Sequence, residues 1–440
     1  MQRNFLFKTV SLSVLTIALF PMNGICAQTE VIAVEADTIL ETPTEIIEED
    51  DILEMIIPLS NGKNGKARRS YDKKRHSLAK KDTLAEKYAH FKQNLSDKIG
   101  LSYTFDVSVL GQRGAPNGKG TAWQTQYYGS VNWDMFSTKI GSGSLQAAYT
   151  YVQYWGKNGQ YISDRIGVIN DINDYTTNSH YFDQLSYTHQ FPDKLSPLSV
   201  TLGQFPMYNF DGSAYDANQQ INFINFALSQ NGTSAYPSAS LGGYVSLSPN
   251  EEWNFTIGMQ DANNIDGSKI ETSYLHRKQF TSFASVSYTP TIKDFGAGQY
   301  SVMLYNQPWT QEQPETVNGW SVNVSQALND KLTIFGRANG VTGDVEPISQ
   351  SYVLGGVVNN PFNRNALDQF GFATAVNKLN KDVNGVNSRS VETVFEGYYS
   401  FGISNFLILT PDVQFYVNPG QDKDNSRTAT VLSMRATLMF

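Results

Sequence analysis

The chain has 440 residues, of which 17% are charged and 12% are aromatic, and it carries a formal net charge of -8 at pH 7. This negative balance disfavours nucleic-acid binding, which relies on a basic surface. The single cysteine, Cys26, lies in the first segment of the chain, so the rest of the sequence offers no disulfide and no thiolate metal site.

Residues 1–27 have the pattern of a secretory signal peptide. Arg3 and Lys8 stand before an apolar run, which is followed by a proline and a small-residue ending at Ala27. We expect cleavage after Ala27, which would remove Cys26. Acylation of Cys26 is the alternative, but the preceding Asn-Gly-Ile lacks the small residue expected immediately before a lipidated cysteine. No later apolar run is long enough for a membrane-spanning helix.

Residues 28–81 consist of an acidic block followed by a basic block, KNGKARRSYDKKRHSLAKK at 63–81. Opposite charge blocks with few aromatics predict a disordered tail. Contact of the basic block with the anionic cell wall or with lipid head groups, or with the acidic block, is the alternative. In residues 82–98, apolar side chains recur at spacings of four, three and four, which predicts a short amphipathic helix. These side chains are Leu84, Tyr88, Phe91 and Leu95.

From residue 100 to 440 the chain alternates apolar and polar residues in short segments separated by turn residues, which is the period of β-strands. In LSYTFDVSV, for example, Leu101 and Tyr103 face one way, and Ser102 and Thr104 face the other. We expect sixteen strands, at residues 100–112, 122–136, 143–155, 181–191, 196–207, 238–248, 251–261, 278–289, 298–306, 317–327, 331–340, 349–359, 366–376, 389–401, 404–417 and 427–440.

Two packed sheets would show the same alternation, so the connections decide between a sandwich and a membrane barrel. The even-numbered connections are short turns, such as SPNEE and ALNDK, whereas several odd-numbered ones are long. Long loops at one rim and tight turns at the other are typical of outer-membrane barrels. Closure also removes every sheet edge, which lipid requires. We therefore predict an all-β protein: a 16-stranded antiparallel transmembrane β-barrel of the outer membrane, with a periplasmic helix at 82–98.

The chain ends in the middle of an alternating segment, MRATLMF at 434–440. The apolar face of this last strand is expected to meet the lipid of the outer membrane. Its terminal aromatic residue, Phe440, resembles the C-terminal signature by which bacterial outer-membrane barrels are recognised by the barrel-assembly machinery. We therefore expect that machinery to be a partner of the chain.

A barrel of sixteen strands leaves a water-filled lumen. Barrel parity places polar side chains on its inner face, and those expected to line a solute path are Arg337, Glu392, Glu396, Asp412, Gln414 and Arg435. Carboxylates and guanidinium groups beside aromatics can bind the hydroxyl pairs and ring faces of sugars. Pairing of these charges with one another across the lumen is the alternative.

The loop at 209–237 carries apolar side chains that would not be buried if the loop extended into solvent. We expect it to fold inward and to narrow the lumen, although packing on the extracellular rim is an alternative. Its candidate constriction residues are Asp211, Asp216, Asn222 and Asn225.

Three stretches carry a resemblance to a known family. They are LGQFPMYNFD through NQQINFINFAL, YPSASLGGYVSLSPNEEWNFTIGMQDAN, and ETVFEGYYSFGISNFLILTPDVQFYVNPG. Through them residues 100–440 resemble the carbohydrate-selective porin family typified by glucose-inducible porin B of Pseudomonas. The resemblance implies a sixteen-stranded barrel that passes monosaccharides and other small sugars by passive diffusion. Where family members often show a Gly-Arg-Asp-type segment, this chain has NNPFNRNALDQFGFA.

Enzyme motifs do not accompany this pattern. The sequence has no Gly-x-Ser-x-Gly elbow, phosphate loop or HExxH motif, and its histidines lack metal-ligand spacing. These are His76, His90, His180, His189 and His276. We expect no catalytic residue, metal or cofactor, but an outer-membrane porin for small neutral solutes, with monosaccharides preferred. A general porin and a surface adhesin with a closed lumen are the alternatives, and a homotrimer stays open.

Overall fold

The computed structural model describes residues 74, 75, 78, 83–116, 120–213, 215, 218–421 and 427–440. The expected signal peptide at 1–27 and almost all of the expected tail at 28–81 lie outside these residues. The helix predicted at 82–98 is confirmed as α3 (Thr83–Ile99). It ends at Gly100, whose positive φ of 68° and N–H bond to the carbonyl of Ser96 close the last turn. Within the described part of the chain, no helix is long and apolar enough to cross a membrane.

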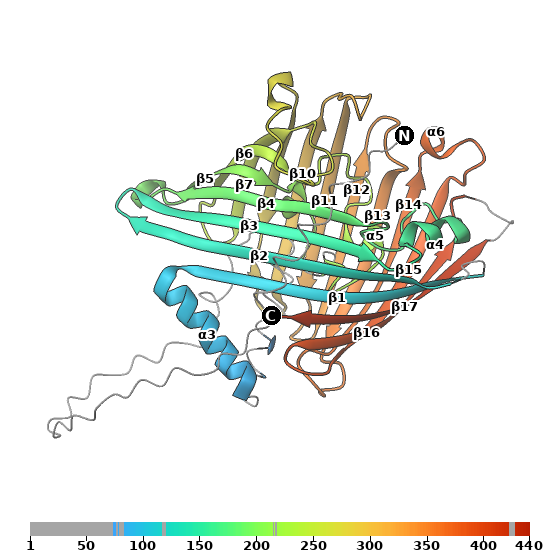
Figure 1. Ribbon diagram of the computed structural model, residues 1–440, viewed down its shortest axis with the longest axis horizontal. Helices are drawn as coiled ribbons and strands as arrows, with labels where there is room; N and C mark the ends of the chain where they lie inside the picture. Colours follow the sequence, from blue (N-terminus) through green and yellow to red (C-terminus); the bar gives the residue numbers. More distant parts are fainter. Residues whose placement is uncertain are drawn as a thin grey trace, which may run out of the picture. The chain divides into compact units, whose positions relative to one another are not determined.

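Seventeen strands among the described residues form one closed antiparallel sheet (Figure 1). They are β1 (Leu101–Ala115), β2 (Ala122–Thr138), β3 (Gly141–Tyr154), β4 (Ser179–Gln190), β5 (Leu198–Phe205), β6 (Ser240–Leu247), β7 (Trp253–Asp261), β8 (Phe280–Tyr288), β9 (Thr291–Ile292), β10 (Gly296–Gln307), β11 (Val317–Ala327), β12 (Leu332–Val341), β13 (Ile348–Asn359), β14 (Gln369–Leu379), β15 (Val391–Gly402), β16 (Leu407–Val417) and β17 (Thr428–Met439).

The sheet closes because β1 pairs with both β2 and β17. The short β9 pairs only with the start of β10, while β8 pairs with β10 directly. Sixteen strands therefore form the barrel wall, which confirms the predicted architecture. Every neighbouring pair is antiparallel, so no unpaired edge faces the membrane.

The connections at one end of the barrel are all short and several at the other end are long, as predicted. The short ones are 139–140, 191–197, 248–252, 289–295, 328–331, 360–368 and 403–406, and the longest ones at the other end are 155–178, 206–239 and 262–279. The long connections contain α4 (Gly159–Ile166), η2 (Met207–Phe210), α5 (Phe226–Ser229) and η3 (Leu275–Arg277). The remaining helical turns are η1 (Asp193–Leu195) and α6 (Lys381–Asn384). By the usual asymmetry of such barrels, the short turns mark the periplasmic end.

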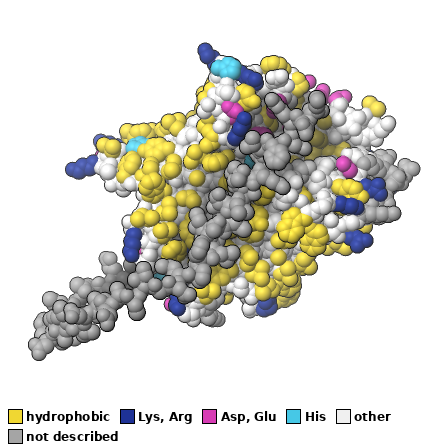
Figure 2. Space-filling view, in the orientation of Figure 1, with side chains coloured by type: hydrophobic (Ala, Val, Ile, Leu, Met, Phe, Trp, Pro, Cys, Tyr) yellow, Lys and Arg dark blue, Asp and Glu magenta, His cyan; other side chains and the backbone are white. Residues whose placement is uncertain are grey.

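The wall separates an apolar outer face from a polar inner face. On β16, Val413 and Phe415 are 46% and 40% exposed, whereas Asp412 and Gln414 between them are almost fully buried. Figure 2 shows hydrophobic side chains spread across the outer surface of the strands. Apolar side chains in this position match the hydrocarbon of a bilayer, which explains the alternation seen in the sequence.

The C-terminal residue belongs to the wall itself. The backbone N–H of Phe440 donates to the carbonyl of Phe105 at 2.9 Å, and the N–H of Phe105 donates back at 3.1 Å. The Phe440 ring stacks on Phe406 with 5.7 Å between ring centroids. The last residue therefore extends the seam between β17 and β1.

Candidate functional site: the lumen and its loops

Glu396 of β15 holds the connection 206–239, called the inward loop from here on. Its Oε1 accepts a hydrogen bond from the backbone N–H of Ile224 at 2.6 Å, and its Oε2 accepts one from the N–H of Asn225 at 2.9 Å. Glu396 is fully buried. Because hydrogen bonds to a carboxylate are stronger than neutral ones, this pair fixes the loop at a defined point of the inner wall.

Glu392, four residues earlier on β15, holds two other loops. Its oxygens accept the backbone N–H groups of Ile169 at 3.0 Å, Asn170 at 2.7 Å and Gly420 at 2.6 Å. Residues 155–178 and the connection between β16 and β17 are thereby joined at one buried carboxylate. The two glutamates lie on the same face of β15 because β-strand side chains alternate with a period of two.

Arg435 of β17 binds the inward loop through its carbonyl groups. Its Nη1 donates to the carbonyl of Asn222 at 2.7 Å and to that of Gln219, and its Nη2 donates to that of Ile221 at 3.0 Å. The planar guanidinium can serve several acceptors in one plane, which an ammonium group cannot do. Arg337 of β12 makes a similar contact, from Nη2 to the carbonyl of Ala227 at 2.6 Å.

Side-chain amides complete the attachment of the loop. Gln414 donates to the carbonyl of Ile172 at 2.9 Å, and its Oε1 accepts from the Asn225 amide at 3.3 Å. Asn225 also donates to the hydroxyl of Tyr416 at 2.7 Å and caps α5 by accepting from the N–H of Ala227. The Asn225 side chain therefore joins β16 to the first turn of a helix.

Asp211 anchors the start of the inward loop to a different part of the wall. Its Oδ1 accepts from Ser321 at 2.5 Å and from Asn323 at 2.9 Å, both on β11. Its Oδ2 accepts from Asn231, further along the same loop, at 2.8 Å. The loop is consequently held at two separate parts of the wall, at β11 and at β15 to β17.

All six residues predicted to line a solute path lie on the inner face and are buried; they are Arg337, Glu392, Glu396, Asp412, Gln414 and Arg435. Five of the six bind loop backbone or loop side chains, and Asp412 lies opposite Ser433 in the register with β17. Their role in lining a path stays a prediction. Of the candidate constriction residues, Asp211, Asn222 and Asn225 take part in these contacts, and Asp216 lies outside the described residues.

A first cavity, of about 270 Å³, lies among the loops of the extracellular end and was not identified from the sequence. Its lining combines carboxyl and phenol groups: Asp174, Tyr175, Asp183, Tyr208, Tyr236 and Glu346. Burial raises the pKa of Glu346 to about 7. These groups come from β4 and from several loops that are distant in sequence, so no local motif could have predicted the cavity.

A second cavity, of about 320 Å³, extends towards the periplasmic turn 248–252. Its inner-face lining is mostly hydroxyl and amide groups: Ser246, Thr256, Ser285, Ser287, Gln299 and Ser301. η2 supplies Tyr208 to the first cavity and Phe210 to the second, so it lies between them. Alternation on β6, β7 and β8 predicts inward Ser and Thr, but such residues are common on any hydrated face and did not stand out.

Asp171 lies in the connection 155–178 where that segment meets the inward loop. Its backbone carbonyl accepts the N–H of Phe226 and the Asn225 amide. Burial, together with the negative charge of Asp164, raises the pKa of the Asp171 carboxyl to about 7. The junction of the two loops therefore contains a group that ionises near neutral pH.

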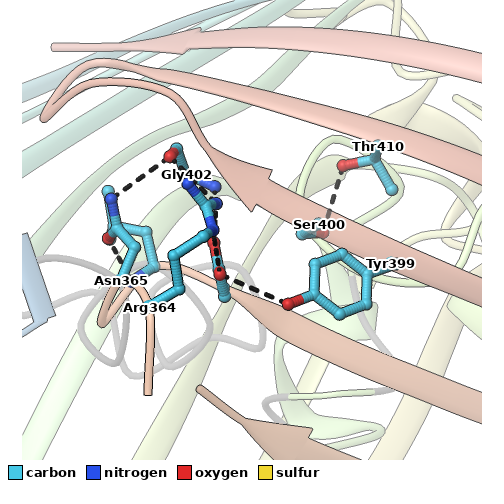
Figure 3. Close-up of polar contacts among 8 residues, drawn as sticks. Arg364, Asn365, Tyr399, Ser400, Gly402 and Thr410 are labelled. Carbon is cyan, nitrogen blue, oxygen red and sulfur yellow. Dashed lines mark hydrogen bonds and ion pairs between the residues drawn. The ribbon is translucent and has the colours of Figure 1, made fainter. Parts of the chain in front are cut away.

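The segment that stands in place of the Gly-Arg-Asp pattern forms the turn between β13 and β14 (Figure 3). Arg364 donates to both oxygens of Asp368, with the Nε contact at 2.7 Å, and to the carbonyl of Gly402 at 3.2 Å. Asp368 also accepts from the backbone N–H of Gly402 at 2.9 Å and from the hydroxyl of Tyr399 at 3.3 Å. These contacts fasten the turn to β15.

The described residues contain no group of three or more His, Cys, Asp or Glu side chains that could hold a metal ion. A closed sixteen-stranded antiparallel barrel with an apolar outer face, a polar inner face and a long loop bound inside it defines a porin.

Comparison with known proteins gives the family. The model described as "Carbohydrate-selective porin, OprB family" matches residues 283–440. Porin AaxA of Chlamydia abortus is 38% identical over 320 residues, which cover 72% of this chain and 70% of the relative. Porin AaxA of Chlamydia pneumoniae is 36% identical over 359 residues, which cover 81% of each chain. The chain belongs to the OprB family of carbohydrate-selective porins.

A solved structure shares the fold. The high-pH structure of Pseudomonas putida OprB superimposes with a TM-score of 0.66 at 17% identity, covering 80% of this chain and 97% of that one. Family and fold together place the chain in the bacterial outer membrane as a transport channel.

Proposed function

We propose that this porin admits small neutral solutes, with monosaccharides preferred, by passive diffusion through the lumen. One observation carries the proposal: the two cavities on either side of η2 are lined mainly by hydroxyl, amide, carboxyl and aromatic groups. These groups can exchange hydrogen bonds with sugar hydroxyls and can cover the apolar face of a sugar ring.

The first cavity suits a sugar because its polar groups stand beside aromatic rings. Tyr175 and Tyr181 lie 5.6 Å apart between ring centroids, and the Tyr208 hydroxyl donates to Asp183 at 3.2 Å. A ring face could stack on the tyrosines while the carboxylate oxygens of Asp183 and Asp174 accept hydroxyl hydrogens.

We propose that the six inner-wall residues predicted from the sequence set the width of this path. In this proposal all of them except Asp412 act by fixing the loops whose surfaces border the two cavities. Glu396 and Arg435 hold the middle of the inward loop, while Glu392 holds the neighbouring loops. Asp211 then fixes the stretch close to η2.

Liposome swelling tests the proposal. Vesicles that contain the purified full chain are diluted into isotonic glucose, other monosaccharides, or triethylene glycol as an uncharged non-sugar. Faster entry of the sugars than of triethylene glycol supports the proposal. Equal rates would indicate a general porin, and an absence of swelling would move the function to the surface loops.

The charge of the lining favours a second candidate, uptake of small organic cations. The cavities carry carboxylates, including Asp174, Asp183, Glu346, Glu251 and Glu252, and neither has a Lys or Arg among its described lining residues. Carboxylates in a confined lumen concentrate cations and repel anions. The zero-current potential in a salt gradient measures this preference, and a cation-selective potential without sugar preference would favour the second candidate.

Two partners predicted from the sequence are also proposed. Recognition of the last strand by the barrel-assembly machinery is supported by the position of Phe440 in the seam with β1. Deletion of Phe440 should lower the yield of folded barrel in cells more than in detergent refolding. Assembly into a homotrimer is an open alternative to the monomer, and the mass of the detergent-solubilised chain distinguishes the two.

A further inference from the structure

The outer wall of the barrel contains an apolar groove of about 1180 Å³. Its ridges are formed by Ile257 and Met259 of β7 and by Leu304 of β10, whose side chains are each more than half exposed. Between them β8 presents only Ser282 and Ala284, and the register pairs Ala284 with both Ile257 and Leu304. Short side chains between longer ones on both neighbouring strands make a groove along β8.

The floor of the groove is supported from inside the barrel. Phe283 of β8 points inward and packs against Phe210 of η2, with 4.8 Å between ring centroids. Phe205 and Tyr244 pack in the same cluster, 4.9 Å apart. Because this aromatic cluster packs directly behind Phe283, that part of the wall has little room to shift, and the groove is preformed.

Basic side chains stand at the extracellular end of the groove. Leu275 and Phe280 both line the groove, and the exposed His276, Arg277 and Lys278 lie between them in the chain. In Figure 2, Lys, Arg and His side chains gather at the top of the view, where Figure 1 draws the connection between β7 and β8 in olive. Cationic groups therefore adjoin the apolar groove directly.

The position of Arg277 is fixed by its neighbours. Its Nη1 donates to Asn263 at 3.0 Å, and its guanidinium lies 4.6 Å from the centroid of the Tyr274 ring. The nearby Glu271 is paired with Lys269 at 2.7 Å, so its charge is already balanced by another cation. The cluster keeps a net positive charge on the side of the groove.

We propose that this groove binds an anionic, phosphate-bearing lipid of the outer leaflet, with one acyl chain along β8 and the phosphate on Arg277 and Lys278. An apolar slot that ends at a basic cluster matches an amphiphile with an anionic head. A second copy of the chain fits less well. Copies inserted in the same orientation and paired about a two-fold axis through this face would bring two basic clusters to the same height, where like charges repel.

The test uses the full chain in phosphatidylcholine bilayers with lipids spin-labelled on the acyl chain. Phosphatidic acid and phosphatidylcholine probes are compared by the fraction of label immobilised at the protein. We expect phosphatidic acid to be preferred, and R277Q/K278Q to reduce its relative association by roughly fivefold for each charge removed. Ala284→Trp, which fills the groove, should lower the number of immobilised chains for both probes.

A matched control is K378Q/K381Q, which removes two exposed basic residues at the extracellular end of β14, away from the groove. It should retain the full preference for phosphatidic acid. Heat-dependent migration on gels confirms that each variant is a folded barrel. Equal immobilisation of the two probes, or an unchanged preference in R277Q/K278Q, would overturn the proposal. The proposal would also be overturned if Ala284→Trp abolished oligomers without changing lipid binding. The groove would then be occupied by a second copy of the chain.

Discussion

Glu396 on the barrel wall and Asn225 on the inward loop are joined by a 2.9 Å hydrogen bond, although they lie 171 positions apart in the chain. The same carboxylate also binds Ile224. This attachment connects the fold to the proposed path, because the inward loop supplies η2, which lies between the two cavities. The following predictions test that connection.

Glu396→Gln should loosen the inward loop without unfolding the barrel. The amide keeps one acceptor oxygen, so one of two buried backbone N–H groups loses its partner, at a cost of about 1–3 kcal/mol in local stability. We expect a larger single-channel conductance with more current noise. Glu312→Gln, at an exposed carboxylate on another loop, is the control. An unchanged conductance in Glu396→Gln would contradict the proposed role of the loop.

Arg435→Ala and Arg435→Lys should differ from the native chain in sugar-dependent conductance. Arg435 serves three carbonyl groups of the loop, and lysine retains the charge without the planar donor geometry. Both variants should therefore alter the conductance, while heat resistance of the barrel in detergent stays the same. Equal loss of folding and conductance would show that Arg435 supports the barrel as a whole.

Phe415→Arg should destabilise insertion by less than the roughly 2–4 kcal/mol that arginine costs at the bilayer midplane, because Phe415 lies two residues before the extracellular end of β16. Phe415 is exposed on the outer face of β16, next to the inward Gln414. A refolding titration into lipid vesicles measures the difference, with Phe415→Leu as the control of similar polarity. If the arginine variant inserted into vesicles as stably as the native chain, this position would not face hydrocarbon.

Packing of the loops should weaken as the pH rises through about 7. Burial raises the pKa of Asp171 from its ordinary value of 3.8 to about 7. The native loop arrangement therefore binds the proton more tightly than the unfolded chain does. The corresponding stabilisation is complete below pH 3.8 and is lost as the carboxyl ionises around pH 7.

Conductance noise recorded between pH 5 and pH 8 should accordingly increase with pH in the native chain. Asp171→Asn, which stays neutral, should show a smaller increase. A response of the same size in both chains would exclude Asp171 as its source, although Glu346, whose pKa is also raised to about 7, would stay a candidate.

The barrel was predictable because its strands obey a local rule. A period of two, an even number of strands and connections of alternating length are all visible in the sequence, and each reflects the contact of one face with lipid. The strand predicted at 366–376 begins later, as β14 (Gln369–Leu379). The predicted start of this strand lies in the turn that the Arg364–Asp368 pair closes. This pair of side chains holds residues 366–368 in the turn, although their sequence continues the strand pattern.

The candidate site was predictable only in part, because alternation identifies the face of a side chain and not its partner. Glu392, Glu396 and Arg435 lie on the inner face as expected. Their partners are backbone groups of loops that are distant in sequence. Every residue carries such groups, so the amino-acid sequence does not show which of them bind these side chains. The two cavities were missed for the same reason, since the fold of the loops creates them.

The central claim is a sugar-preferring diffusion channel, and single-channel recording in a planar bilayer tests it most directly. The purified full chain is reconstituted, and glucose, other monosaccharides and triethylene glycol are titrated during the recording. We predict stepwise conductance that sugars block in a concentration-dependent manner and that triethylene glycol leaves open. Open channels that respond equally to sugars and to triethylene glycol, or an absence of conductance, would contradict the claim.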